Sequence, residues 1–355
     1  MTNDGLQIRS KNELRAVSLG ETPPCKMAPA HRTLYFVIRT SLIRHPSSVI
    51  PHLSSPPMLL LIRPAAFALN AQTAVNNFFQ PQTADEDTGA IALLALAEFD
   101  AMVGQLQAAD IDVAVVQDTT EPHTPDSIFP NNWVSFHANG HVLYPMYAAN
   151  RRLERKLDIW SSVSRTRLKL DLSEEENQGR FLEGTGSLVL DRANSIAYAA
   201  LSERTHEALV KRWCEVMGHT AVMFSALQTV GNKRLPIYHT NVMMSVGEGF
   251  ALWCPECIDD EAERTAVEQT LRAADKELIT ISEAQMHAFA GNILQVFNRK
   301  GESLVLMSAT AEAALQGQAL DALRRHGRIL ACAIPTIEKY GGGSARCMVA
   351  EVPAL

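Results

Sequence analysis

The sequence predicts an α/β fold, and three observations support this prediction. From Met58 onward, short apolar runs typical of strands alternate with longer stretches of helical periodicity. The chain has 355 residues, of which 46% are hydrophobic and 20% charged, so it can bury a substantial core. The alternation is compatible with units of roughly sixty residues repeated about five times.

The elements follow in order from residue 58. A strand over 58–62 is followed by an amphipathic helix over 91–108, which leads into a second strand over 111–116. No Gly-rich phosphate-binding sequence follows the first strand, so neither a dinucleotide site nor a P-loop is predicted. Further strands are predicted at 133–136, 142–144, 187–190, 196–200, 221–224, 251–254, 303–307 and 329–334, and helices at 151–160, 203–216, 259–274 and 311–326.

Residues 1–57 differ in composition from the remainder. They hold seven basic residues against three acidic ones, with seven Pro and seven Ser, and their apolar run 34–38 is too short for a signal-peptide core. A flexible tail or transit-like leader is one interpretation. Translation from an upstream start is the one we favour, because Met58 opens the first strand. We therefore expect a poorly structured extension over 1–57 and one catalytic domain over 58–355.

The bulk properties exclude several classes of protein. A net charge of -7 leaves no basic footprint for nucleic acid, and the uncharged apolar runs are far shorter than a membrane span. Six cysteines in so long a chain favour reduced thiols and a cytoplasmic location. The sequence does not give the oligomeric state, and a homodimer is left open. Cys254 and Cys257 form a CxxC pair, but no second pair follows to complete a metal site.

Cys347 is the candidate nucleophile. It follows Gly341, Gly342 and Gly343, which let the backbone approach a ligand closely. The neighbouring Arg346 would favour the thiolate, which is the nucleophilic form. The alternative is an inert buried cysteine opening a short strand over 347–350.

Three polar clusters upstream supply partners for such a thiol. His239 opens an apolar segment and would transfer protons, unless it is a structural histidine bonded to the backbone. Glu183 precedes a tight turn, where an ordinary exposed acid is the alternative. Asp126, Asn131, Asn132 and Trp133 lie beside two prolines, and they form either a rigid polar edge to a pocket or a well-capped turn.

Taken together in this order, the motifs Phe129–Asn132, Leu182–Gly184, His239–Asn241 and Cys347 resemble the guanidine-modifying (amidinotransferase, or pentein) superfamily. The resemblance covers residues 58–355 and is closest to members that hydrolyse citrulline. It implies a five-bladed α/β propeller built from ββαβ repeats, with the site at the central channel. It also implies Cys347 as nucleophile, His239 as general acid/base and Glu183 as the carboxylate that orients it. Arg151, Arg152 and Arg346 are candidates for binding a substrate carboxylate, although a solvated helix face is the alternative for Arg151 and Arg152.

Two amides depart from the superfamily pattern. Where relatives that bind guanidinium ions commonly carry two carboxylates, this chain has Asn132 and Asn241, and a third carboxylate is replaced at Gly186. A buried guanidinium needs negative partners, whereas an amide suits a neutral ureido group. We therefore expect hydrolysis of citrulline to ornithine, with no metal or organic cofactor. Asp126 still offers a carboxylate, so a guanidino hydrolase or amidinotransferase remains an alternative, as does a non-catalytic binding propeller.

Overall fold

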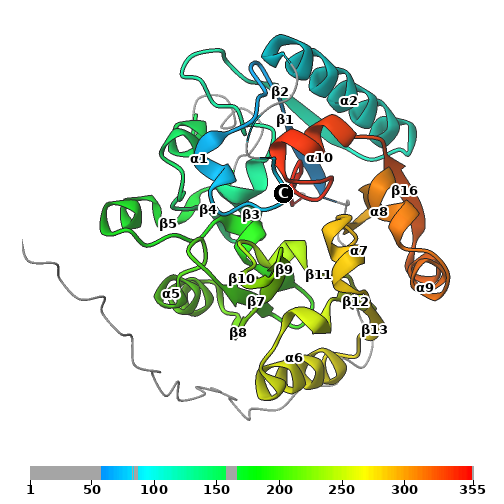
Figure 1. Ribbon diagram of the computed structural model, residues 1–355. Coiled ribbons are helices and arrows are strands. Elements are labelled where there is room, and N and C mark those ends of the chain that lie inside the picture. Colours follow the sequence, from blue (N-terminus) through cyan, green and yellow to red (C-terminus); the bar gives the residue numbers. More distant parts are fainter. Residues whose placement is uncertain (1–56, 82, 84–86, 157–165, 354–355) are drawn as a thin grey trace, which may run out of the picture. The chain divides into compact units, whose positions relative to one another are not determined.

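The computed structural model describes residues 57–81, 83, 87–156 and 166–353. Within the unit formed by residues 58–353, the strands form five separate three-stranded sheets and one hairpin, and no strand pairing among the described residues joins one sheet to the next (Figure 1). In every sheet the first pair of strands is antiparallel and the second pair is parallel. The sheets are β17–β1–β2 (Ala350–Val352, Met58–Arg63, Val113–Gln117), β3–β4–β5 (Val134–His137, Gly140–Leu143, Leu168–Asp171), β6–β7–β8 (Val189–Asp191, Ile196–Leu201, Thr220–Ser225), β11–β12–β13 (Met244–Val246, Phe250–Trp253, Glu277–Thr280) and β14–β15–β16 (Leu294–Phe297, Ser303–Ser308, Arg328–Cys332).

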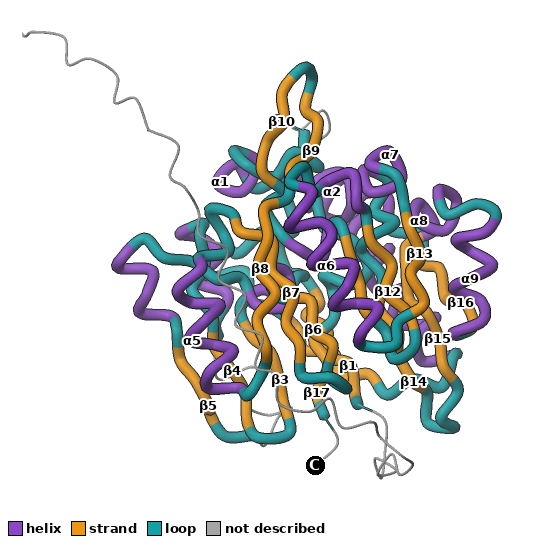
Figure 2. The backbone as a smooth tube through the Cα atoms, turned by 90° about the horizontal axis from the view of Figure 1, so that it is seen from below, coloured by secondary structure: helices purple, strands orange, loops and turns teal. Residues whose placement is uncertain are grey.

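The longer crossover helices connect the parallel strands of four of these sheets and lie on the outer side of the strands (Figure 1). The order ββαβ is contiguous in three sheets, where α5 (Glu207–Met217), α6 (Glu261–Ala273), or α8 and α9 (Ala309–Ala314, Gln318–His326) supply the crossover. The sheet of β1 and β2 is crossed by α2 (Thr88–Ala108) and takes its first strand, β17, from the far end of the sequence. Figure 2 shows the hairpin of β9 (Leu227–Val230) and β10 (Lys233–Pro236) projecting away from the sheets.

Neighbouring sheets contact each other through their first strands. Contacts join β17 to β3, β6 to β11 and β11 to β14. Buried apolar side chains also join the sheets of β1 and β15, because Leu59, Leu61 and Met348 belong to one core cluster with Leu304 and Leu306. The polar segments that precede the first strands are thereby brought together.

One described helix, α2, is long and apolar enough by length and composition to cross a membrane. Its side chains Ile91, Phe99 and Leu106 are fully buried within the unit, and the helix contacts β1, β2 and β16. A helix buried in the core of a globular protein can have the same length and apolar composition as a membrane-spanning helix, so these two properties alone do not assign α2 to a membrane.

Most predicted elements are confirmed within one or two residues, and the α/β class is confirmed. The predicted helix 311–326 is wrong as a single element, because Gly317 with φ +68° separates α8 from α9. The predicted helix 203–216 begins only at Glu207, since Ser202 and Thr205 form a bridge. For the predicted helix 151–160, residues 157–160 lie outside the described residues, and Ala149–Glu154 form the 3₁₀ helix η2. The run 34–38 also lies outside them.

Candidate active site

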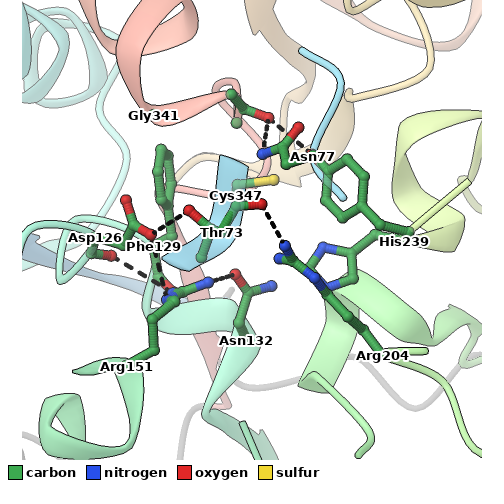
Figure 3. Close-up of a pocket in the computed structure, with 13 residues that line it drawn as sticks. Thr73, Asn77, Asp126, Phe129, Asn132, Arg151, Arg204, His239, Gly341 and Cys347 are labelled. Carbon is green, nitrogen blue, oxygen red and sulfur yellow. Dashed lines mark hydrogen bonds and ion pairs between the residues drawn. The ribbon is translucent and has the colours of Figure 1, made fainter. Parts of the chain in front are cut away.

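A pocket lies where the segments before the first strands converge (Figure 3). Of the residues expected from the sequence, the structure places Asp126, Asn132, Arg151, His239 and Cys347 in its lining. Figure 3 shows Asp126, Arg151 and Asn132 on one side, and His239 and Arg204 on the other. The other lining residues are Thr73, Asn77, Phe129, Tyr238, Gly341, Gly342 and Gly343.

The Gly-rich segment brings Cys347 to this pocket. Helix α10 (Pro335–Gly341) ends at Gly342, which has φ +62° and would bring a Cβ within 2.4 Å of Asn77 Nδ2. A Cβ at Gly341 or Gly343 would lie 2.7 or 2.9 Å from the ring of Phe129. The three glycines therefore permit close packing against the pocket wall, and Cys347, 5% exposed, follows in a turn closed by its N–H on the Ser344 carbonyl.

Glu183 and His239 form a fully buried pair. His239 Nε2 lies 2.7 Å from Glu183 Oε2, while Glu183 Oε1 accepts a hydrogen bond from the Tyr147 N–H. Burial alone would raise the pKa of Glu183, but Arg204, 3.5 Å from the carboxylate, and the bond from His239 lower it to about 2. Glu183 is therefore ionised at neutral pH and can only accept a proton in this bond.

The ionised carboxylate fixes the tautomer of His239. Burial lowers the pKa of His239 to about 4, against the opposing effect of Glu183, so the imidazole is neutral at neutral pH. Because Nε2 must carry the proton donated to Glu183, Nδ1 is the ring atom that can accept one. This is the state that a general base requires.

Arg151 fixes the orientation of Asn132. The Arg151 guanidinium is buried and binds both carboxylate oxygens of Glu154, at 2.8 and 3.0 Å. Its Nη1 donates to Asn132 Oδ1 at 2.8 Å, and since arginine only donates, the remaining amide atom of Asn132 is the NH₂ group. Among the described residues, neither Asn132 Nδ2 nor Asp126 Oδ1 has a hydrogen-bond partner, although both are buried. Burial also raises the pKa of Asp126, with Arg151 opposing.

Asn241 lies behind the nucleophile rather than in the pocket lining. It belongs to the 3₁₀ helix η4 (Thr240–Val242), and its Nδ2 lies 3.4 Å from Cys347 Sγ. Its expected contact with a guanidino or ureido group stays a prediction, and the structure shows contact with the sulfur.

Two of the expected arginines are not brought to the pocket lining. Arg152 donates to the carbonyls of Met146 and Tyr147. Arg346 donates to the Val349 carbonyl and pairs with Glu351 at 3.6 Å.

Arg204 lines the pocket and was missed by the sequence reasoning. It is 2% exposed, donates to the Thr73 carbonyl at 2.9 Å and lies over the Tyr238 ring, 4.9 Å from its centroid. Arg204 was assigned to the predicted helix 203–216 and was therefore not considered as a site residue. In the structure it follows the end of β7, and a charged residue directly after a buried strand is the signal that could have identified it.

With this geometry in place, comparison with known proteins is informative. The family model for N,N dimethylarginine dimethylhydrolase, eukaryotic, matches residues 63–354. The chain belongs to this family. It is therefore a member of the guanidine-modifying superfamily that the motifs resemble. No curated protein sequence matches it.

Solved structures share the fold of this family member at low sequence identity. Apo ArgZ, an arginine dihydrolase from the ornithine-ammonia cycle in cyanobacteria, is 16% identical with a TM-score of 0.65, over 84% of this chain and 41% of ArgZ. AgrE in complex with ornithine and NAD+ is 18% identical, with a TM-score of 0.64 over 83% of this chain and 39% of AgrE. The chain thus spans about two fifths of these two proteins. A dimethylarginine dimethylaminohydrolase adduct with 4-chloro-2-hydroxymethylpyridine is 14% identical, with a TM-score of 0.57 over 83% of this chain and 99% of that one.

Proposed function

We propose that this chain hydrolyses the ureido group of citrulline, giving ornithine, carbon dioxide and ammonia. The observation that carries the proposal is the orientation of Asn132. Because Arg151 occupies its carbonyl oxygen, Asn132 presents only N–H donors to the pocket. A ureido oxygen accepts such a bond, whereas a guanidinium group has no acceptor to offer. A buried donor left without an acceptor costs about 1–3 kcal/mol, which favours the ureido substrate.

The unpartnered oxygen of Asp126 complements this donor. Asp126 and Asn132 both line the pocket, and Asp126 Oδ1 and Asn132 Nδ2 are buried without a partner among the described residues, so an acceptor and a donor are available to a bound substrate. A planar ureido group carries both a carbonyl oxygen and N–H groups, and it satisfies the two side chains at once.

The remaining residues supply the chemistry of C–N cleavage. Cys347 Sγ attacks the ureido carbon, and the thiol proton passes to His239 Nδ1, which Glu183 keeps oriented. The protonated imidazole then gives this proton to the departing nitrogen as the C–N bond breaks. Ornithine is released, and the carbamoyl group remains on Cys347 as an S-carbamoyl cysteine. His239 next removes a proton from water, which attacks the carbamoyl carbon and releases the thiolate. The carbamate product decomposes to carbon dioxide and ammonia.

A second candidate is hydrolysis of a guanidino substrate, favoured by the buried Asp126 carboxylate and by the family to which the chain belongs. Asp126 would then pair with the cationic guanidinium, as desolvated cations require. Arginine would yield citrulline and ammonia, and dimethylarginine would yield citrulline and dimethylamine. An amidinotransferase is a variant of this candidate, in which a second amine takes the place of water and receives the amidino group.

Separate incubations with citrulline, arginine and dimethylarginine decide between these candidates. We expect ornithine to form from citrulline at a kcat/KM at least 100-fold above that for either guanidino compound, measured by chromatography of the amino acids. Cys347→Ser should abolish turnover because serine is a much weaker nucleophile. Citrulline accumulating from arginine or dimethylarginine would overturn the ureido proposal, and full activity of Cys347→Ser would overturn the mechanism.

We also propose that the five sheets are the blades of a five-bladed α/β propeller with the pocket at its centre. The contacts between successive first strands and the convergence of the polar segments support this arrangement. A cytoplasmic location is a proposal that rests on the cysteine content, and a homodimer is a separate proposal that composition does not address.

A further inference from the structure

We propose that Asn292 is a positioning residue that holds the sulfur of Cys347 in place and stabilises the thiolate that forms when its proton passes to His239. Asn292 Nδ2 lies 3.2 Å from Cys347 Sγ, and the Asn241 amide approaches the same sulfur at 3.4 Å. Neither asparagine lines the pocket, whereas Cys347 does. The two amides thus contact the sulfur while leaving the pocket open to substrate. The inference rests on the proposed role of Cys347 as the nucleophile.

The identity of the donor atom in Asn292 follows from its second contact. Its Nδ2 also lies 3.2 Å from the backbone carbonyl of Asn241, which can only accept a hydrogen bond. The atom between this carbonyl and the sulfur is therefore the amide NH₂, and its two protons serve the two acceptors. A thiolate accepts such bonds more strongly than a thiol, because hydrogen bonds to the charged form favour that form.

The backbone around Asn292 is built to hold this geometry. A Cβ at Gly291 would lie 2.2 Å from the Val242 carbonyl oxygen, so this segment packs directly on the backbone of η4. Phe289 has φ +61°, and the Asn292 N–H closes the turn on the Phe289 carbonyl at 2.9 Å. Asn292 itself is 2% exposed. An amide fixed in this way loses little freedom when it binds the sulfur.

Five other titratable or charged groups line the same pocket, and a sixth immediately precedes Cys347 in the chain. They are Asp126, Arg151, Arg204, Tyr238 and His239 in the lining, and Arg346 beside Cys347. All of them are retained when only Asn292 is changed. The difference between the wild-type protein and an Asn292 variant therefore reports the contribution of this one amide.

The test is the rate of alkylation of Cys347 by iodoacetamide between pH 5 and 10, followed by mass spectrometry of the peptide that contains it. The thiolate forms an S–C bond and iodide leaves, so no substrate is needed. Asn292→Ala should lower the rate at pH 7 about tenfold and move the half-maximal rate upward by about one pH unit. Asn292→Asp, which keeps the side-chain volume but places a carboxylate beside the sulfur, should move it further upward.

Asn298→Ala is the matched control. Asn298 is 1% exposed, and its amide bonds the Ala109 carbonyl and Glu302 rather than the sulfur. This variant should lose stability but keep the wild-type alkylation profile. Wild-type profiles in both Asn292 variants would overturn this inference alone. A wild-type Cys347 that reacts no faster than Cys214 and Cys332 would overturn it together with the nucleophile itself.

Discussion

Gly186 separates the two side chains on which the proposed chemistry depends. A Cβ at this position would lie 2.5 Å from Asn132 Nδ2 and 2.8 Å from His239 Nδ1. Both neighbours are held in place, Asn132 by Arg151 and His239 by Glu183. In the superfamily motif that this chain resembles, a carboxylate residue stands at the position of Gly186. A side chain of that size has no room at this position here.

Gly186→Ala should lower kcat by at least tenfold, because the methyl group displaces the imidazole or the amide, and a displacement of about 1 Å can cost 100-fold. Overpacking should also lower the free energy of unfolding by about 1–3 kcal/mol. Steady-state kinetics and urea titration measure both effects. The control is Gly104→Ala, where a Cβ in α2 meets no atom within 4 Å. Wild-type kcat in Gly186→Ala would contradict the close packing.

The pair of His239 and Glu183 should make stability depend on pH. Burial lowers the pKa of His239 from 6.5 to about 4 in the folded protein, so the unfolded chain binds more protons between these values. Stability supplied by the neutral imidazole is therefore present above pH 6.5 and lost as the pH falls to 4. Glu183, lowered from 4.5 to about 2, adds a further loss below pH 4.5.

We expect the free energy of unfolding to fall by at most about 3 kcal/mol between pH 6.5 and 4 through His239. Urea titrations at successive pH values measure the slope, and His239→Gln, which does not titrate, is the comparison. The variant should lose less stability than the wild-type protein over this range. Parallel curves for the two proteins would show that the imidazole is not held neutral.

At the scale of the element, strands with continuous apolar sequence were predictable, and strands with exposed faces were not. β7 and β15 are buried along most of their length and read clearly as strands. In β5, three of four residues are exposed, and its Leu-Lys-Leu-Asp sequence lacks a continuous apolar run. Such an edge strand is stabilised by its partner in the sheet rather than by its own pattern.

The site residues that belong to a sequence motif could be predicted from the sequence. Glu183, His239 and Cys347 follow the order of the superfamily, and the structure brings them together. Asn292 and Arg204 belong to no such motif, and only the packing of distant segments gives them partners. The contact of Asn241 with the sulfur likewise depends on how η4 meets the Cys347 turn, which no local pattern encodes.

At the scale of the whole described unit, one rule locates the site. The first strand of every sheet is preceded by a polar or nucleophilic side chain that lines the pocket, contacts the sulfur or, in the case of Glu183, bonds His239. These are Asn132 before β3, Glu183 before β6, His239 and Asn241 before β11, Asn292 before β14, and Cys347 before β17. Each sheet thus contributes one part of the chemistry. A repeated fold with converging strand starts assembles a site from residues far apart in sequence.

The same architecture predicts which part of the chain suffices for folding. β1 begins at Met58 and lies between β17 and β2, and both partners belong to residues 58–353. A chain beginning at Met58 should therefore keep kcat/KM within about twofold and its melting temperature within about 2 °C, since no described sheet loses a strand.

A chain beginning at Pro64 is the matched comparison, because it removes the whole of β1. Leu59, Leu60 and Leu61 are at most 1% exposed, so the deletion would remove the middle strand of a sheet and open the core beneath α2. Truncating a buried leucine to alanine costs about 2–5 kcal/mol, so the loss of three is comparable with the whole stability of a typical domain, about 5–15 kcal/mol. This shorter chain should be insoluble or unfolded by circular dichroism. Insolubility of the chain beginning at Met58 would instead show that residues 1–57 contribute to folding, and β1 would then not be the boundary of the catalytic domain.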